Sequence, residues 1–375
     1  MLSLPSNFIK IQLHPLNYCA LALACSIACV SLFYAWIIWG ITIIAIALVL
    51  LPKQSRWWLL VIAATYLGGA YRFQSTMQVH HAFVERLNNI PCTLKGAILS
   101  IEPQEGARTK QKITIQTDSF LISGDIPYRS EQIIQIYLTR STNARVADEI
   151  EIHDFCLKKN KNESYDDYLI KENIAATVFL TSLDYKLIHR PSFSLSRGLF
   201  YFKQNLLARC RKKLSRSTFA FFASVFLGNK SFGKKQMEEP KDNCKTWGIS
   251  HYLARSGLHM VIFICIWFFL LNLMPLSFRL KQFLLIGIGI LYHILSWPSI
   301  SFIRAFMSFL LFKSCTLLQL PSQLLHLLTL VTIAVLLHNP MQLFFLDFQL
   351  SFGLTFALAW FNHVGAQKTC IAAKY

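Results

Sequence analysis

Apolar runs at both ends of the chain flank a polar middle. Near the N-terminus, Leu16–Trp39 and Gly40–Leu51 together give about 35 nearly uncharged residues, enough for a tight hairpin of two spans of roughly 17 residues or more each. Trp57–Tyr71 predicts a third span. After the polar middle, the pattern predicts five more spans, which are Tyr252–Met274, Phe283–Trp297, Phe302–Leu318, Leu324–Leu337 and Leu343–Phe361. We therefore expect membrane helices in residues 1–76 and 246–375.

The polar middle, residues 77–192, contains short runs of alternating apolar and polar residues. Five such runs predict strands, at Thr93–Ile101, Lys112–Asp118, Gln132–Leu138, Glu149–Phe155 and Ala175–Leu180. Five strands in about 90 residues suit a small barrel such as an OB-fold, and a two-sheet sandwich is the alternative. The predicted fold class is a polytopic α-helical membrane protein with an inserted all-β, OB-like domain.

Composition supports this division. The chain of 375 residues is 54% hydrophobic and only 15% charged, against about 25% charged for soluble domains, which excludes an ordinary soluble globule. Residues 77–192 hold 14 basic and 15 acidic residues, and the rest of the chain holds 23 basic and 4 acidic. The net charge of +18 therefore belongs to the membrane part, where Asp347 is the only carboxylate in an apolar stretch.

Basic residues in the short loops set the predicted orientation. A consistent positive-inside assignment places the N-terminus in the cytoplasm and residues 77–192 on the outer side. It assumes that the short apolar stretch Thr218–Leu227 does not cross the membrane, since a crossing there would invert the later spans. The residues assigned to the cytoplasm are Lys10, Lys53, Arg56, Arg279, Lys281, Lys368 and Lys374.

A basic linker, residues 193–245, follows the polar middle. Its stretch Ser196–Lys245 has 12 basic residues against 3 acidic ones. Apolar residues recur in it with a helix-like pattern, at Leu199, Phe202, Leu206, Leu207 and Leu214. This pattern suits a helix lying in the headgroup plane on anionic lipid, and it equally suits contact with a polyanionic substrate.

Neither a metal site nor a nucleotide site is indicated. The ten cysteines show no paired CxxC spacing. Two of them, Cys92 and Cys156, lie in the polar middle. The sequence allows either a disulfide between them or two unpaired buried thiols. The stretch Gly228–Lys235 looks like a phosphate loop but lacks the final Ser or Thr and follows an apolar helix. We therefore expect no cofactor and no enzyme activity.

Polar residues cluster where apolar spans begin. His251, Arg255 and His259 recur every four residues and share one side of a helix. An Arg in this setting needs a wet cavity, a counter-charge or an anionic ligand, unless it reaches out to the headgroups. With the topology above, Arg255, Arg304 and Asp347 all lie a few residues inside the outer ends of their spans. Their depths in the membrane agree within roughly 10 Å. They predict either a polar vestibule beneath the outer domain or an ion pair that locks helices together.

These residues also carry a resemblance. The motifs His251-x-Leu-Ala-x-Ser256-Gly257-Leu258-His259, Arg304-Ala305, Asn339-Pro340 and Phe348-Gln349-Leu350-Ser351-Phe352, in this order and spacing, resemble the ComEC family of DNA-uptake channels of natural transformation. Asn162–Ala176 resembles the end of that family's outer OB-like domain, although Asn173 stands where a Gly is usual. The resemblance implies a channel in the bacterial inner membrane that passes one DNA strand into the cytoplasm.

Carried over by position, the resemblance implies a set of residues along the DNA path. These are His251, Ser256, Gly257, His259, Arg304 and Gln349. The two other charged residues of the predicted vestibule, Arg255 and Asp347, and Ser351 of the Phe348–Phe352 motif complete the predicted path. On the outer domain, basic and aromatic residues offer DNA contacts at Lys110, Lys112, Tyr165 and Tyr168. The domain's net charge is close to −1, so we expect weak guidance of the strand there rather than tight binding.

Further partners follow from the family and from energetics. Moving a strand toward a negative cytoplasm costs about 2.3 kcal/mol per charge per 100 mV, so a separate cytoplasmic ATPase or helicase motor is expected. Membrane lipid, an outer DNA receptor, a metallo-β-lactamase-like subunit and a second copy of the chain are further expected partners.

Long family members continue into a metallo-β-lactamase-like domain. The sequence therefore fits three descriptions, which are a short form, half of a split protein and a truncated remnant. The alternative functions are a membrane enzyme, a small-anion transporter and a non-functional remnant.

Overall fold

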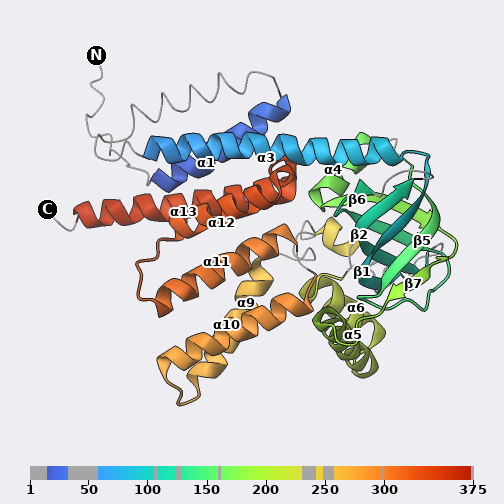
Figure 1. The fold of residues 1–375 in the computed structure, drawn as a ribbon. Coiled ribbons are helices and arrows are strands. Elements are labelled where there is room, and N and C mark those ends of the chain that lie inside the picture. The colour runs from blue at the N-terminus through green and yellow to red at the C-terminus, as the bar shows by residue number, and fades with distance from the viewer. Residues whose placement is uncertain are drawn as a thin grey trace. The chain divides into compact units, whose positions relative to one another are not determined.

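The computed structural model describes residues 15–32, 58–104, 109–122, 128–158, 162–229, 242–247, 257–297 and 299–372 (Figure 1). The chain divides into two compact units. One unit comprises residues 1–75 and 307–375, and the other comprises residues 76–306. The predicted second span, Gly40–Leu51, lies outside the described residues.

The 76–306 unit contains a mixed β-sheet, and all five predicted strands are present in it. They are β1 (Pro91–Pro103), β2 (Gln111–Ile122), β4 (Ile133–Leu138), β5 (Glu149–Cys156) and β6 (Ile174–Leu180). The alternation did not predict β3 (Tyr128–Arg129) or β7 (Lys186–His189). The strand order is β6-β4-β2-β1-β5-β7, with β3 paired to β2. Among the described strands, β4 and β6 pair in parallel and the other pairs are antiparallel.

The predicted alternation has a direct structural cause. In β4, residues 134, 136 and 138 are buried while the residues between them are partly exposed. The inward side chains of the sheet form one core, which the last turns of α3 (Trp58–Leu87) complete with Phe83, Val84 and Leu87. A short helix, α4 (Glu163–Lys171), starts at Asn162, whose side chain accepts from Ser164 N–H at 3.1 Å. The description of this domain as all-β therefore missed one helix.

The two cysteines of the sheet are both free thiols. Cys92 pairs with Phe155 in the ladder, whereas Cys156 pairs with Pro91, one position away. Directly opposite residues share a face and successive residues alternate, so the register points Cys92 and Cys156 to opposite faces. Burial, with the nearby Cys156 thiol, raises the pKa of Cys92 to about 11. Both thiols are thus unpaired in the structure, with Cys92 buried and Cys156 partly buried.

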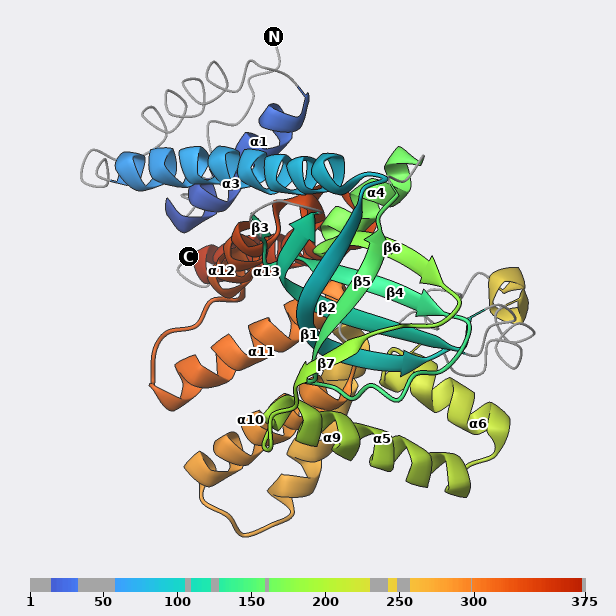
Figure 2. The same ribbon diagram turned by 45° about the vertical axis from the view of Figure 1, so that its right-hand side comes forward.

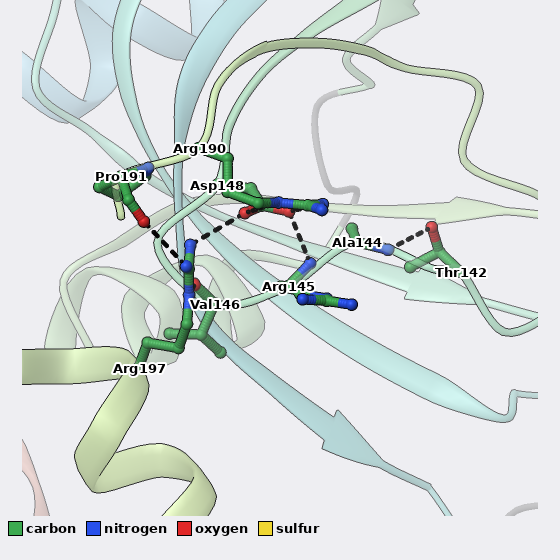
Figure 3. A network of polar contacts seen from close by, with 8 residues as sticks. All are labelled: Thr142, Ala144, Arg145, Val146, Asp148, Arg190, Pro191 and Arg197. Atoms are coloured by element: carbon green, nitrogen blue, oxygen red, sulfur yellow. Dashed lines mark hydrogen bonds and ion pairs between the residues drawn. The ribbon is translucent and has the colours of Figure 1, made fainter. Parts of the chain in front are cut away.

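One buried carboxylate fastens the helix after the sheet to the sheet itself (Figure 3). Asp148, just before β5, is fully buried and accepts two hydrogen bonds from Arg190, through Nε at 2.9 Å and Nη2 at 2.7 Å. Arg197 Nη2 donates to it at 3.0 Å, and the Arg145 backbone N–H at 2.9 Å. Arg197 lies in the first turn of α5 (Leu195–Lys213) and also donates to the carbonyls of Val146 and Pro191. The start of α5 is therefore held rigidly against β5.

Helices make up most of the other described residues of the 76–306 unit, and the last three of them fall on apolar runs that predict spans. After α5 come α6 (Arg216–Phe221), the π-helix η2 (Phe222–Phe226), α9 (Gly257–Asn272), α10 (Phe278–Leu295) and the start of α11 (Ile300–Leu317). Both views show α5 next to the sheet and to one end of α10 (Figure 1, Figure 2). Among the described residues, α10 and α11 are the two helices long and apolar enough to cross a membrane. The remaining spans and their orientation stay predictions.

The other unit contains α1 (Pro15–Leu32), the start of α3, α12 (Leu324–His338), the 3-10 helix η3 (Pro340–Phe344) and α13 (Leu346–Ala372). Thr329 on α12 donates to Asn17 Oδ1 on α1 at 2.6 Å. Arg72 on α3 donates to the carbonyls of Leu337 and His338, at 3.2 and 3.4 Å. A cation at the carbonyl end of a helix is stabilising, so Arg72 fixes the end of α12 to α3.

Candidate functional site

The start of α9 packs closely against the start of α11. A Cβ atom placed on Gly257 would lie 3.1 Å from Ala305 Cβ, 3.2 Å from the Ser301 carbonyl and 3.3 Å from Arg304 Nη2. These distances are tighter than most real Cβ contacts, so a side chain at position 257 would push the two helices slightly apart, and small residues are common where helices cross closely. The structure thus brings together Gly257 and the Arg304-Ala305 pair, which are about 47 positions apart in the sequence. Arg304 Nη2 therefore lies close to the first residue of α9.

His259 and its neighbours form an aromatic cluster beside this contact. The His259 ring meets the ring of Phe226, at the end of η2, edge-on at 5.9 Å. The Phe226 carbonyl accepts a hydrogen bond from Tyr292 OH on α10 at 2.8 Å. Tyr292 also stacks on Phe263 of α9, with ring centroids 4.1 Å apart. His259 therefore helps to hold η2, α9 and α10 together.

Trp297, in the turn between α10 and α11, joins these helices to the sheet domain. Its indole Nε1–H donates to Glu102 Oε1 on β1 at 2.6 Å. Its backbone N–H donates to the Leu227 carbonyl at 2.7 Å. Lys203 of α5 places its Nζ 3.3 Å from the centre of the indole ring, a cation–π contact. One side chain thus connects α5, β1 and the turn.

From Glu102 a row of side chains crosses the outward face of the sheet. Lys112 on β2 lies 3.5 Å from Glu102 Oε2 and opposite Tyr137 on β4. Tyr137 lies opposite Phe179 on β6, and the two rings stack at 5.0 Å. We call the residues Lys112, Tyr137 and Phe179, together with Tyr165 and Tyr168 of α4, the aromatic strip.

The two α4 tyrosines belong with this row. The rings of Tyr165 and Tyr168 stack on each other at 6.2 Å. Burial raises the pKa of Tyr137, and the nearby Tyr165 and Tyr168 hydroxyls raise it further. Phe179 is 69% exposed, an unusual position for so large an apolar side chain. From the sequence, Lys112, Tyr165 and Tyr168 were expected as DNA contacts and Phe179 was not, because β6 is almost entirely apolar and has no polar–apolar alternation around it.

The fourth predicted outer contact is Lys110. It lines a cavity of about 390 Å³ together with Arg145, Tyr201 and Gln204. The cavity thus joins the β1–β2 connection to α5, on the side of the Asp148 network.

The remaining predicted path residues of the described chain lie in the other unit. Asp347 is exposed in the first turn of α13, and its Oδ1 accepts from Phe348 N–H at 3.2 Å. Gln349 donates to the Leu343 carbonyl at 2.9 Å and lines an apolar cavity of about 620 Å³ between α1, α12 and α13. The Ser351 hydroxyl is buried and makes no hydrogen bond to a described residue.

Three predicted path residues, His251, Arg255 and Ser256, lie outside the described residues. Arg304 and Asp347 belong to different units, so the vestibule proposed around Arg255, Arg304 and Asp347 stays a prediction. No group of three or more His, Cys, Asp or Glu residues that could hold a metal occurs in the described part of the chain.

The helical region that carries Gly257, Arg304 and Gln349 also has a family match. Residues 225–370 match the family model of the competence protein. This match indicates a role in DNA uptake, and together with the two span-length helices α10 and α11 it indicates a membrane protein. The competence region begins in η2 and ends in α13, so it includes Trp297 but leaves the sheet outside. No curated protein and no solved structure matches the chain.

Proposed function

We propose that the chain is a component of an inner-membrane channel that passes single-stranded DNA into the cytoplasm during natural transformation. The observation that carries the proposal is the competence match over the segment in which Gly257 brings α9 onto Arg304. In this proposal the protein acts by position and charge rather than by chemical catalysis.

Arg304 is the proposed phosphate contact within the helices. Its Nη2 lies close to Gly257, the first residue of α9, which places the guanidinium beside the contact of the two helices. A fixed cation near the end of a span lowers the local cost of bringing a phosphate into the membrane region. His259 would act indirectly, because its ring holds η2 and α9 together through Phe226.

The aromatic strip is the proposed guide on the outer side. Stacking on aromatic side chains contributes about 1–3 kcal/mol per base and tolerates any sequence. The strand order, with β1 between β2 and β5 and a parallel β4–β6 pair, supports an OB-like barrel, and such barrels bind strands over the sheet face that includes β2 and β4. Glu102 beside Lys112 and the near-neutral domain favour weak binding, which suits a strand that must move on.

Energy for transport must come from another chain in this proposal. Each phosphate that crosses against a negative interior costs about 2.3 kcal/mol per 100 mV, and fixed cations cannot change the total over a complete passage. A cytoplasmic motor or capture of the strand inside would supply the work.

The test is uptake of labelled DNA into a nuclease-protected form in a strain that carries single variants. Arg304→Ala should lower uptake about tenfold or more, the loss expected from about 1.4 kcal/mol of phosphate stabilisation. Arg279→Ala removes the same charge from an exposed position on α10 and is the matched control. Protein levels in the membrane must be equal for all variants.

Two outcomes separate the parts of the proposal. Normal uptake in a strain without the gene would show that the chain has no role in transformation. Loss of uptake in that strain with normal uptake for Arg304→Ala would retain the function and reject the assigned phosphate contact. Replacing Tyr165 and Tyr168 with Ala tests the strip separately, through weaker binding of labelled single strands by the reconstituted protein.

A further inference from the structure

Helix α5 has one face that is fixed to the rest of its unit. Along that face Arg197 binds Asp148, Phe200 packs against the core of the sheet, and Lys203 covers Trp297. One turn later Leu207 is buried with Phe219, Ala223 and Leu227. These positions recur every three or four residues, so α5 cannot roll about its axis without breaking all of the contacts.

These contacts also fix the position of α5 relative to the turn between α10 and α11. Trp297 and Ser296 form the turn between α10 and α11, the two helices long enough to cross a membrane. If both helices cross, their connecting turn lies at a membrane surface. Lys203 Nζ donates to the Ser296 carbonyl at 3.4 Å and lies on the Trp297 ring. The middle of α5 is therefore held at the membrane surface, where Trp is a preferred residue.

The neighbouring face of α5 is apolar and uncovered in its unit. Leu195, Leu199 and Phe202 follow the i, i+4, i+7 spacing of one helix face and are 68%, 39% and 51% exposed. Leu199 lies one turn before Lys203, so this stripe borders the side that touches the span turn. We call Leu195, Leu199 and Phe202 the α5 stripe.

Cations flank the end of this stripe. Exposed basic residues occupy the last turns of α5 and the start of α6, at Arg209, Arg211, Lys212, Lys213 and Arg216. An exposed apolar face that ends in basic residues is the pattern of helices that lie in the surface of an anionic bilayer. Each cation near such a surface is attracted to the acidic lipids, while the apolar side chains enter the boundary between headgroups and acyl chains.

We propose that α5 is a membrane-surface helix that inserts the α5 stripe into the outer boundary of a bilayer containing anionic phospholipid. The partner is the lipid surface, because the stripe lies at the level of the span turn and its flanking charges are positive. In this arrangement the Asp148 network and Trp297 hold the sheet domain at a fixed height above the bilayer. The inference depends on α10 and α11 crossing the membrane and does not depend on DNA uptake.

The test uses the full-length protein reconstituted into vesicles, with a fluorescent unnatural amino acid at one position at a time. Positions 199 and 202 report on the stripe. Position 205, an exposed Asn on another side of the same helix, is the matched control. Vesicles contain phosphatidylcholine with brominated acyl chains, with or without phosphatidylglycerol, and the measurement is quenching of the fluorophore by bromine.

Quenching at positions 199 and 202 should exceed that at 205 by about twofold or more, and phosphatidylglycerol should increase the difference. Equal quenching at all three positions, or none at any, would overturn the proposal. Cross-linking between two copies through position 199, or loss of quenching at 202 on adding single-stranded DNA, would show another occupant and also overturn it. Because no outcome uses DNA uptake, the proposed function can fail while this inference stands.

Discussion

The Asp148 network allows a quantitative prediction about how the sheet domain is attached. Asp148→Asn keeps the size of the side chain but removes the charge that Arg190 and Arg197 share. The new amide also places N–H donors where the carboxylate accepted from guanidinium groups and from the Arg145 backbone. Two cations that were paired in the folded protein then lack a counter-charge.

The size of the effect follows from burial. Breaking a buried ion pair by removing one partner costs about 3–5 kcal/mol. The Asp148 side chain is fully buried, but that of Arg190 is 36% exposed, so water can recover part of the loss. We therefore expect the lower end, about 3 kcal/mol, against a typical domain stability of about 5–15 kcal/mol.

The assay is hydrogen–deuterium exchange of the full-length protein in detergent micelles. Amides of β5, β7 and the first turns of α5 should exchange about a hundredfold faster in Asp148→Asn than in the wild type, since each 1.4 kcal/mol is a factor of ten. Asp184→Asn removes the same charge from an exposed loop of the same domain and is the control. If the two variants exchange alike at β5 and α5, the network does not hold the helix.

Acid should reproduce part of this effect. Burial alone would raise the pKa of Asp148, but hydrogen bonds from Arg190 and the Arg145 N–H, with the charges of Arg190 and Arg197, outweigh it and lower the pKa. A lowered folded-state pKa means that the stabilisation is complete above the unfolded value of about 4 and is lost as the pH falls through the folded value. Wild-type protection of β5 should therefore fall below about pH 4, and Asp148→Asn should show a flatter decline.

Two further variants test contacts of the helical region. Gly257→Val should separate α9 from α11 at a cost of about 1–3 kcal/mol, because even a Cβ there would lie 3.1 Å from Ala305 Cβ. Gly287→Val is the control, because a Cβ at position 287 has no neighbouring atom within 4 Å. Cysteine cross-linking between α9 and α11 measures the separation, and equal cross-linking in both variants would contradict the assigned contact. Trp297→Phe keeps a ring but removes the donor to Glu102, so exchange in η2 and α5 should rise about tenfold, from a loss of about 1.5 kcal/mol. Combining it with Glu102→Gln should add little, and full additivity would mean that the two groups do not interact.

The sequence predicted the sheet well because its strands are half-buried. In β2 and β4 one residue in two faces the core, and this produces the alternation by which both were recognised. By contrast, all four residues of β7 are exposed, so the strand has no alternation and depends on pairing with β5. Helix α4 has little apolar content and starts from the Asn162 cap. Its two tyrosines, Tyr165 and Tyr168, therefore did not form an apolar pattern that predicts a helix.

The candidate site was predictable only where a residue type was itself unusual. Arg304 in an apolar stretch stood out, and Gly257 was placed by a motif. Nothing in the sequence distinguishes Asp148 from the other acidic residues of a nearly neutral domain. Its role depends on Arg190 and Arg197, which are more than 40 positions away. Trp297 gave no signal either, because an aromatic residue at the end of an apolar run is ordinary. Both residues act through contacts that the fold creates and that local patterns do not contain.

The distribution of charge fits the different roles that the proposed function gives to the helical part and to the sheet domain. A strand in transit must be bound strongly enough to enter and weakly enough to leave, as in other channels. The membrane part carries 23 basic and 4 acidic residues, whereas the sheet domain carries 14 and 15. An outer domain with strong phosphate binding would hold the strand through every contact at once and oppose a motor that pulls from inside. Stacking on the aromatic strip orients bases without adding fixed charge, so attraction would increase only as the strand approaches the helices that contain Arg304.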